Sequence, residues 1–133
     1  MGAVIDSSVL IAVERAKIGL DGLLRDHGQE EIAIATITAS ELLHGVHRAA
    51  KPSQRARREA FVETVLGLVP VLPFDMVAAR LHARLWAQLA AKGVHVGAHD
   101  LLIGATALAV GYEVATHDKR SFPKIPGLQV VAW

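Results

Sequence analysis

The stretch AVIDSSVLIAVER, residues 3–15, decides the fold class. Its first three residues are apolar, which predicts a short buried strand over 3–5. From Ser7 to Arg15 the apolar side chains recur at helical spacing, which predicts a helix directly after that strand. A buried strand followed at once by a helix is the first half of a βαβ unit, so we expect a parallel sheet.

The rest of the chain repeats this alternation of strands and helices. Further apolar runs predict strands at 31–34, 69–73, 112–116 and 129–132. Apolar periodicity and turn residues predict helices at 19–27, 38–50, 53–66, 75–91 and 99–110, with Ser53 and Asp75 as the caps of the two helices that begin there. Strands that alternate with helices form a parallel sheet with both faces covered. The predicted fold class is therefore α/β, with a central parallel sheet flanked by helices in one domain over residues 1–133.

Composition limits what the chain can do. It has 133 residues and no Cys, which excludes disulfides, thiolate zinc sites and a Cys nucleophile. Hydrophobic residues make up 52% of the chain, which excludes disorder. The net charge is only +1, so nucleic-acid binding would need a local basic patch. No apolar run approaches the roughly 20 residues of a membrane span, and the start lacks the basic segment of a secretory signal. We therefore expect a cytoplasmic protein with no membrane partner.

Four acidic residues stand at or near predicted helix starts: Asp6, Glu41, Asp100 and Asp118. Each has a purely structural explanation, either as a helix or turn cap, as part of the capping box Thr38-Ala39-Ser40-Glu41, or as a first-turn anion favoured by the helix dipole. Asp6 and Asp118 also follow predicted strands, however. The turns after parallel strands lie along one edge of the sheet, where ligands bind. If the strands at 3–5 and 112–116 are neighbours, the four carboxylates converge on one pocket.

Such a pocket favours metal chemistry. Carboxylates without partners repel one another and raise one another's pKa values, and a hard divalent cation relieves that repulsion. Oxygen ligands select Mg²⁺ or Mn²⁺, and a phosphodiester supplies the remaining anionic oxygens. We therefore predict metal-activated water attacking phosphorus, with Asp6, Glu41, Asp100 and Asp118 as metal ligands and catalytic residues. Which acid orients the water, and whether one or two metals bind, stays open.

Four motifs, in order along the chain, resemble those of a known family. They are Asp6-Ser7-Ser8, Ser40-Glu41-Leu42-Leu43-His44-Gly45, the run from Asp100 to Ala107, and the run from Thr116 to Phe122. The ordered set is similar to PIN domain ribonucleases, and the tail 125–130 resembles that of VapC-type toxins of type II toxin–antitoxin pairs. The resemblance implies a magnesium-dependent endoribonuclease that forms a homodimer and is held inactive by a small antitoxin. Many family members carry an acid where Ser121 stands, so a second metal would be held weakly.

Residues around the four acids are candidates for supporting roles. Ser7 and Thr116 carry hydroxyls beside the acids, and we expect both to support the site. His99 and His117 each precede one of the acids, so we expect them to line the mouth of the pocket, and His117 either contacts substrate or is solvated. A basic run has no acid within it and is either a solvated face or a phosphate-steering patch: Arg48, Lys51, Arg55, Arg57 and Arg58. The seven His residues lack the paired motifs of metal-binding helices, so we predict no zinc site.

The residues also predict a partner. The chain is unusually apolar for its size, so some side chains of its early helices should form an exposed contact surface: Ile11, Leu24, Leu42, Leu43 and Val46. Guanidinium groups bind carboxylates bidentately. We therefore expect a small protein that covers the apolar surface and inserts an Arg into the acidic site, and the resemblance implies that this protein is a VapB-like antitoxin.

Two other functions stay open at this point. One is a phosphatase or phosphotransfer domain with Asp6 as nucleophile, although the haloacid-dehalogenase-like pattern needs a second Asp where Ser8 stands. The other is a non-catalytic binding module whose acids are only helix caps, for which metal would not change stability. The RNA target cannot be read from the chain.

Overall fold

The computed structural model describes residues 2–16 and 19–133. Its elements are β1 (Gly2–Ile5), α1 (Ser7–Arg15), α2 (Leu20–Asp26), β2 (Glu31–Ala35), α3 (Thr36–Arg48), α4 (Pro52–Leu68), β3 (Val71–Leu72), α5 (Met76–Ala91), α6 (Ala98–Val110), β4 (Glu113–Ala115), the 3₁₀ turn η1 (Phe122–Lys124) and β5 (Val130–Val131). The predicted alternation of strands and helices is confirmed.

The strands form one parallel sheet in the order β3-β2-β1-β4-β5. β1 lies at its centre, where Val4 pairs with Ala33 of β2 on one side and with Val114 of β4 on the other. The chain builds outward from β1 in both directions, so β1 and β4 flank the point where the strand order reverses. Such a switch point opens a crevice at the carboxyl edge of the sheet. The neighbouring strands required for the four acids to converge are therefore present.

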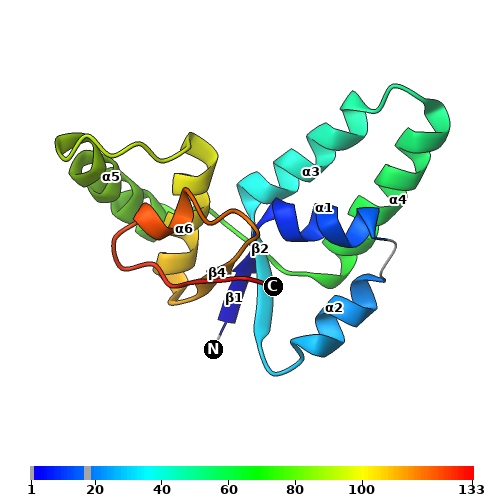
Figure 1. Ribbon diagram of the computed structural model, residues 1–133, viewed down its shortest axis with the longest axis horizontal. Helices are drawn as coiled ribbons and strands as arrows, with labels where there is room; N and C mark the ends of the chain where they lie inside the picture. Colours follow the sequence, from blue (N-terminus) through cyan, green and yellow to red (C-terminus); the bar gives the residue numbers. More distant parts are fainter. Residues whose placement is uncertain (1, 17–18) are drawn as a thin grey trace.

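Two hydrophobic clusters attach helices to the two faces of the sheet. One joins α5, α6 and the tail, and its buried members include Val4, Val114 and Phe122. The other joins α1 to α4 and includes Ile5 and Leu10. Figure 1 shows α5 and α6 as one arm of a V and α3 and α4 as the other, with the strands and α2 towards its base. The carboxyl edge of the sheet faces the notch of this V.

The start of α3 differs from the prediction. β2 continues to Ala35, and the helix begins at Thr36 with Ala35 as N-cap, so Thr38 is not a cap and the predicted capping box is wrong. Thr38 shares the buried face of α3 with Leu42, one turn later. Glu41 therefore lies in the second turn of α3, where its carboxylate is free to serve another purpose.

Two other predicted helix starts have different outcomes. α4 begins at Pro52 rather than after a Ser53 cap, because proline suits the first helical position and needs no N–H partner there. The Asp75 cap of α5 is confirmed, since its carboxylate accepts a hydrogen bond from the Ala78 N–H at 3.0 Å. No helix within residues 2–16 and 19–133 has the length and apolar character to cross a bilayer.

Candidate active site

Asp6 lies at the carboxyl end of the central strand and is only 6% exposed. Its Oδ2 accepts hydrogen bonds from the Ser8 hydroxyl at 2.8 Å and from the Thr116 hydroxyl at 2.9 Å. Its backbone N–H donates to the Ala115 carbonyl at 2.9 Å, which continues the β1–β4 pairing. Asp6 occupies the N-cap position of α1, but its side chain makes no capping bond. The capping explanation for Asp6 is therefore wrong.

The same two hydroxyls connect the turns after β1 and β4. Thr116 Oγ1 accepts the Asp118 N–H at 2.9 Å, and Ser8 Oγ accepts the His117 N–H at 3.1 Å. Thr116 thus lies where a supporting residue was predicted. Ser8, rather than the predicted Ser7, supplies the hydroxyl that contacts Asp6. Two of these four hydrogen bonds, from Thr116 to Asp6 and from the His117 N–H to Ser8, join the turn that carries Asp6 to the turn that carries Asp118.

Asp118 belongs both to the turn after β4 and to the edge of the crevice. Its Oδ1 accepts the Arg120 N–H at 2.9 Å, which confirms that it caps the turn that follows. The Arg120 guanidinium lies 3.9 Å from the same oxygen and is almost fully exposed. Asp118 therefore stands at the rim of the crevice, with one oxygen engaged in the turn.

Glu41 reaches across to the other arm of the V. Its Oε2 lies 3.2 Å from Nδ1 of His99, at the start of α6. Its Oε1 is buried and has no hydrogen-bond partner among the described residues. Burial is the main cause that raises the pKa of the Glu41 carboxyl; the contact with His99 opposes this, and the charges of Asp6 and Asp100 add to it. A buried carboxylate oxygen without a partner suits a cation or a proton.

Asp100 lies in the first turn of α6, as predicted. Burial raises the pKa of its carboxyl, the hydrogen bond with Ser121 opposes the rise, and the charges of Asp6 and Asp118 increase it. A Cβ at Gly97 would stand 3.4 Å from Asp100 Oδ2, so this glycine leaves room beside the carboxylate. Ser121 also accepts the Gly97 N–H at 3.3 Å.

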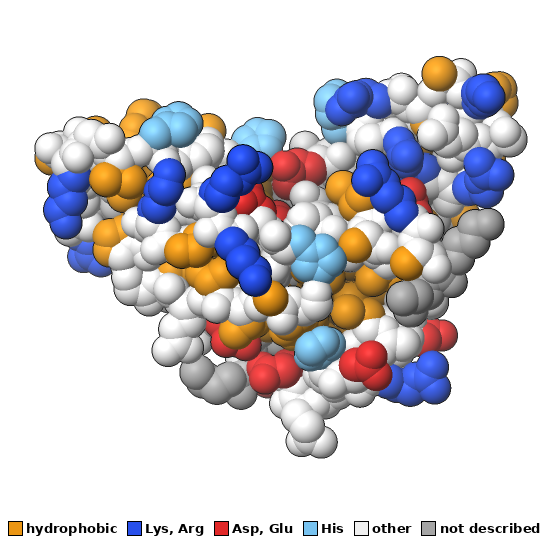
Figure 2. All heavy atoms as spheres, viewed as in Figure 1, with side chains coloured by type: hydrophobic (Ala, Val, Ile, Leu, Met, Phe, Trp, Pro, Cys, Tyr) orange, Lys and Arg blue, Asp and Glu red, His pale blue; other side chains and the backbone are white. Residues whose placement is uncertain are grey.

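The four acids thus lie close enough for their charges to act on one another. Figure 2 shows acidic side chains in the notch between the two arms, with Lys and Arg side chains on both sides of it. In the described part of the chain, no three His, Asp or Glu side chains are grouped closely enough to hold a metal ion as they stand. The donor set nevertheless fits a hard cation, because it offers carboxylate oxygens only and includes the buried, unpartnered Oε1 of Glu41.

Part of the predicted basic run has structural partners. Arg55 donates from Nη2 to the Ala49 carbonyl at 2.9 Å. Arg58 donates from Nη1 to the Gly45 carbonyl at 3.2 Å, and its Nε lies 3.6 Å from Glu14 Oε1. These two side chains hold α4 against α3 and α1, so they are not purely solvated, and their contact with phosphate stays a prediction.

The remaining predicted substrate contacts are exposed side chains. Arg48 and Arg57 lie on the surface and stay predictions. The ring Nε2 of His117 contacts the Trp133 carbonyl, and the Trp133 ring stacks on His27 with centroids 3.6 Å apart. His117 therefore fixes the tail next to the crevice, and its role toward a substrate stays a prediction.

Two side chains that touch the acids were missed, Ser8 and Ser121, and His99 was expected only to line the mouth of the pocket. Ser8 follows Asp6 by two residues, a spacing at which serine often bonds a nearby carboxylate. Ser121 occupies the place where the resembled family carries an acid, so its closeness to the other acids was deducible. His99 meets Glu41 across 58 residues of sequence, and no local pattern indicates that contact.

The predicted apolar surface is present in part. Ile11 and Leu43 are exposed at 40% and 37%, whereas Leu42 and Val46 are buried. Leu24 is half-buried. A second group of exposed apolar side chains lies around the edge strand β3: Leu68, Val71, Phe74, Met76 and Val77.

Comparison with known proteins places this geometry in a family. Residues 3–128 match the PIN domain family model. The chain is 37% identical to ribonuclease VapC1 of Rickettsia felis over 131 residues, which are 98% of this chain and 96% of that protein. Its fold resembles DNA-bound VapBC from Salmonella typhimurium, with a TM-score of 0.87, 28% identity and coverage of 100% and 98% of the two chains. It also resembles VapBC-5 of Mycobacterium tuberculosis, a member of the VapBC family of toxin–antitoxin systems, with a TM-score of 0.76, 34% identity and coverage of 99% and 98%.

Proposed function

The chain belongs to the PIN domain family and, within it, to the VapC proteins, and on that premise we propose that it is a Mg²⁺-dependent endoribonuclease, the toxin of a toxin–antitoxin pair. The observation that carries the proposal is the gathering of one buried and three half-buried carboxylates at the β1–β4 switch point. Burial and mutual charge raise the pKa values of Glu41 and Asp100 there. A site that crowds carboxylates in this way is suited to a divalent cation rather than to stabilising the fold.

Asp6, Glu41, Asp100 and Asp118 would hold Mg²⁺, with Mn²⁺ as a substitute. A metal bound there supplies Lewis-acid chemistry, which polarises a phosphodiester and lowers the pKa of water. Asp6 is kept in one orientation by its two hydroxyl donors, so only its other oxygen faces the crevice. Glu41 has a buried oxygen available to accept the proton of the attacking water. Hydrolysis would then form a bond from the water oxygen to phosphorus and break one P–O bond of the RNA backbone, and the leaving oxygen would take up a proton from solvent to become a hydroxyl group.

The RNA strand would enter the notch between the two arms. Exposed cations on the rim support this path, since Arg120 stands beside Asp118 and Arg48 and Arg57 lie on the α3–α4 arm. Their charges would compensate for the repulsion between phosphates and the acids before a metal binds. We place this reaction in the cytoplasm, where its substrate RNA is found.

The partners follow from the two apolar surfaces. The exposed Ile11 and Leu43 lie on α1 and α3, the helices that frame the crevice on one arm. An antitoxin helix that covers them would bring an Arg within reach of the acids and neutralise the site. The exposed apolar group at 68–77, around β3, is the surface we propose for the homodimer.

Of the two alternatives, the non-catalytic module is disfavoured by particular contacts. The Asp6 and Glu41 carboxylates bond to Ser8, Thr116 and His99, and neither caps its own helix. The phosphotransfer alternative predicts an acyl phosphate on the Asp6 carboxylate. An acid-quenched trap with a labelled phosphomonoester would detect it, whereas the nuclease releases no labelled protein.

The proposal is tested by cleavage of RNA with purified protein, in Mg²⁺ and in chelator. We expect Asp6→Asn, Glu41→Gln, Asp100→Asn and Asp118→Asn each to abolish Mg²⁺-dependent cleavage and to leave the fold intact. Asp75→Asn is the matched control, because it neutralises an acid outside the crevice and Asn also caps helices well. Cleavage that persists in chelator, or in all four variants, would refute the proposed site.

A further inference from the structure

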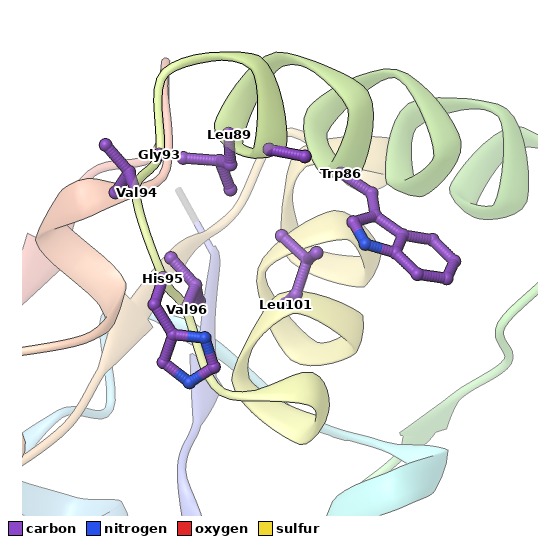
Figure 3. A pocket seen from close by; sticks show the side chains of 8 residues that line it. Trp86, Leu89, Gly93, Val94, His95, Val96 and Leu101 are labelled. Carbon is purple, nitrogen blue, oxygen red and sulfur yellow. The ribbon is translucent and has the colours of Figure 1, made fainter.

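A hollow of about 250 Å³ lies beside the first turn of α6, between α5 and the segment 93–97. Its lining includes Trp86 and Leu89 from α5, Val94 and His95 from the connecting segment, and Leu101 from α6. In Figure 3 the Trp86 ring stands at one end, Val94 and His95 stand at the other, and Leu101 lies between them.

The walls of this hollow suit a flat aromatic ring with polar edges. The Trp86 side chain is 64% exposed, so most of its indole surface is available for stacking. Leu89 and Leu101 form a buried apolar floor, and the exposed His95 offers an imidazole at the opposite end for hydrogen bonding. The volume is below the roughly 300–1,000 Å³ of pockets for drug-sized ligands, so one ring system suits it better than a longer chain.

The hollow and the acidic crevice share the first turn of α6. Leu101 follows Asp100 directly, and the segment that forms one wall ends at Gly97, which lies against the Asp100 carboxylate. The wall is also complementary in charge to a polyanion. Residues 76–99 contain Arg80, Arg84, Lys92 and three His residues, and no Asp or Glu.

We propose that this hollow binds one nucleobase of the RNA, adjacent to the phosphodiester held at the acids. The inference rests on the proposed nuclease function and adds a subsite to it. Proteins recognise single-stranded RNA by splaying bases out and stacking them on aromatic side chains. A base stacked on Trp86 would set the register of the strand, so that a defined phosphodiester lies at Asp100.

The test combines an abasic scan of the RNA with substitutions in the hollow. An RNA oligonucleotide that the wild-type chain cleaves is prepared with an abasic residue at each position around the cut. We expect one position to lower kcat/KM by about tenfold or more, as base–aromatic stacking implies. Trp86→Ala should cause a similar loss on the intact RNA and no further loss with the abasic residue at that position, because the two changes remove the same contact.

Two variants and one control complete the design. Trp86→Phe should restore most of the rate, and His95→Ala should weaken the preference for the base at the same position. Val110→Ala removes an apolar side chain that is 46% exposed at the far end of α6, and it should change neither kcat/KM nor the abasic profile.

The outcomes separate the two levels of the proposal. If the wild-type chain cleaves no RNA, the nuclease function itself is wrong and the subsite falls with it. The subsite alone is overturned if the chain cleaves RNA but Trp86→Ala and His95→Ala retain the wild-type kcat/KM. It is also overturned if the losses of kcat/KM caused by Trp86→Ala and by the abasic residue multiply when the two changes are combined. Dissociation of a wild-type dimer by Trp86→Ala in sedimentation would assign the indole to an interface and would also overturn it.

Discussion

Replacing Asp6 by Asn or by Ala distinguishes a metal ligand from a structural carboxylate. Asn retains one oxygen that can accept from Ser8 and Thr116, and it changes only the atom that faces the crevice. We therefore expect the free energy of unfolding of metal-free Asp6→Asn to lie within about 0.5 kcal/mol of the wild-type value. Ala removes the acceptor altogether, and Thr116 is only 1% exposed, so water cannot replace it. The unsatisfied hydroxyl should cost Asp6→Ala about 1–3 kcal/mol.

The effect of metal has a calculable size. An ion at about one hundred times its Kd stabilises the native state by about 2.7 kcal/mol. For a chain of this length, 1 kcal/mol shifts Tm by about 4 °C, so saturating Mn²⁺ should raise the wild-type Tm by about 10 °C. Both Asp6 variants should lose most of that increment, because a neutral side chain binds the cation poorly.

Scanning calorimetry with and without Mn²⁺, on the wild type, both Asp6 variants and the Asp75→Asn control, measures all of these quantities. Asp75→Asn should keep the full metal-induced shift. A full shift in Asp6→Asn would show that Asp6 is not a ligand. Equal destabilisation of Asp6→Asn and Asp6→Ala in metal-free buffer would show that the charge itself supports the fold.

Three further predictions concern the surroundings of the acids. The pKa values of Glu41 and Asp100 are raised because the native state penalises their charged forms. As pH falls from neutrality through those raised values, the metal-free wild type should therefore gain stability relative to the double variant Glu41→Gln, Asp100→Asn. The difference in the free energy of unfolding should level off below the ordinary pKa values of 4.5 and 3.8. Urea unfolding in chelator across that range measures it, and parallel curves for the two proteins would contradict it. Arg48→Gln and Arg57→Gln should each lower the slope of RNA-binding affinity against salt concentration, on logarithmic axes, by about 0.7. An unchanged slope would show that Arg48 and Arg57 are solvated charges. Arg58→Gln should instead lower the free energy of unfolding by about 1 kcal/mol, because it loses the hydrogen bond to Gly45. Ser121→Asp should lower metal-free stability, because it adds a charge beside Asp100, and should enlarge the Mn²⁺-induced rise in Tm; a reduced rise would show that position 121 does not face the ion.

Much of the fold follows from patterns that are local in the sequence. The apolar run at 3–5 and the helical spacing after it predict β1 and α1, because burial on one face leaves its period in the sequence. The pairing of β1 with β4 could be assumed but not predicted, because strand pairing across more than a hundred residues leaves no periodic pattern in the sequence.

The incorrect predictions have a common physical cause. Thr38-Ala39-Ser40-Glu41 has the composition of a capping box, but β2 runs directly into α3, so the same four residues fall inside the helix. Arg55 and Arg58 have the sequence of a solvated basic face, yet α4 packs on α3 and directs both side chains to backbone carbonyls. In each case the packing of neighbouring elements decides the role, and the composition of one short segment does not report it.

The pairing of β1 with β4 also determines when the pocket forms during synthesis of the chain. The residues that build the pocket run from Asp6 to Asp118, so its first part is made long before its last. At about 5–20 residues per second, a ribosome needs roughly 6–22 s to travel between them. During that interval β1 has no β4 beside it, and the carboxylates are spread along an unfinished polypeptide. A growing chain, although it is surrounded by RNA, therefore carries no assembled pocket, and the pocket forms only near the end of synthesis.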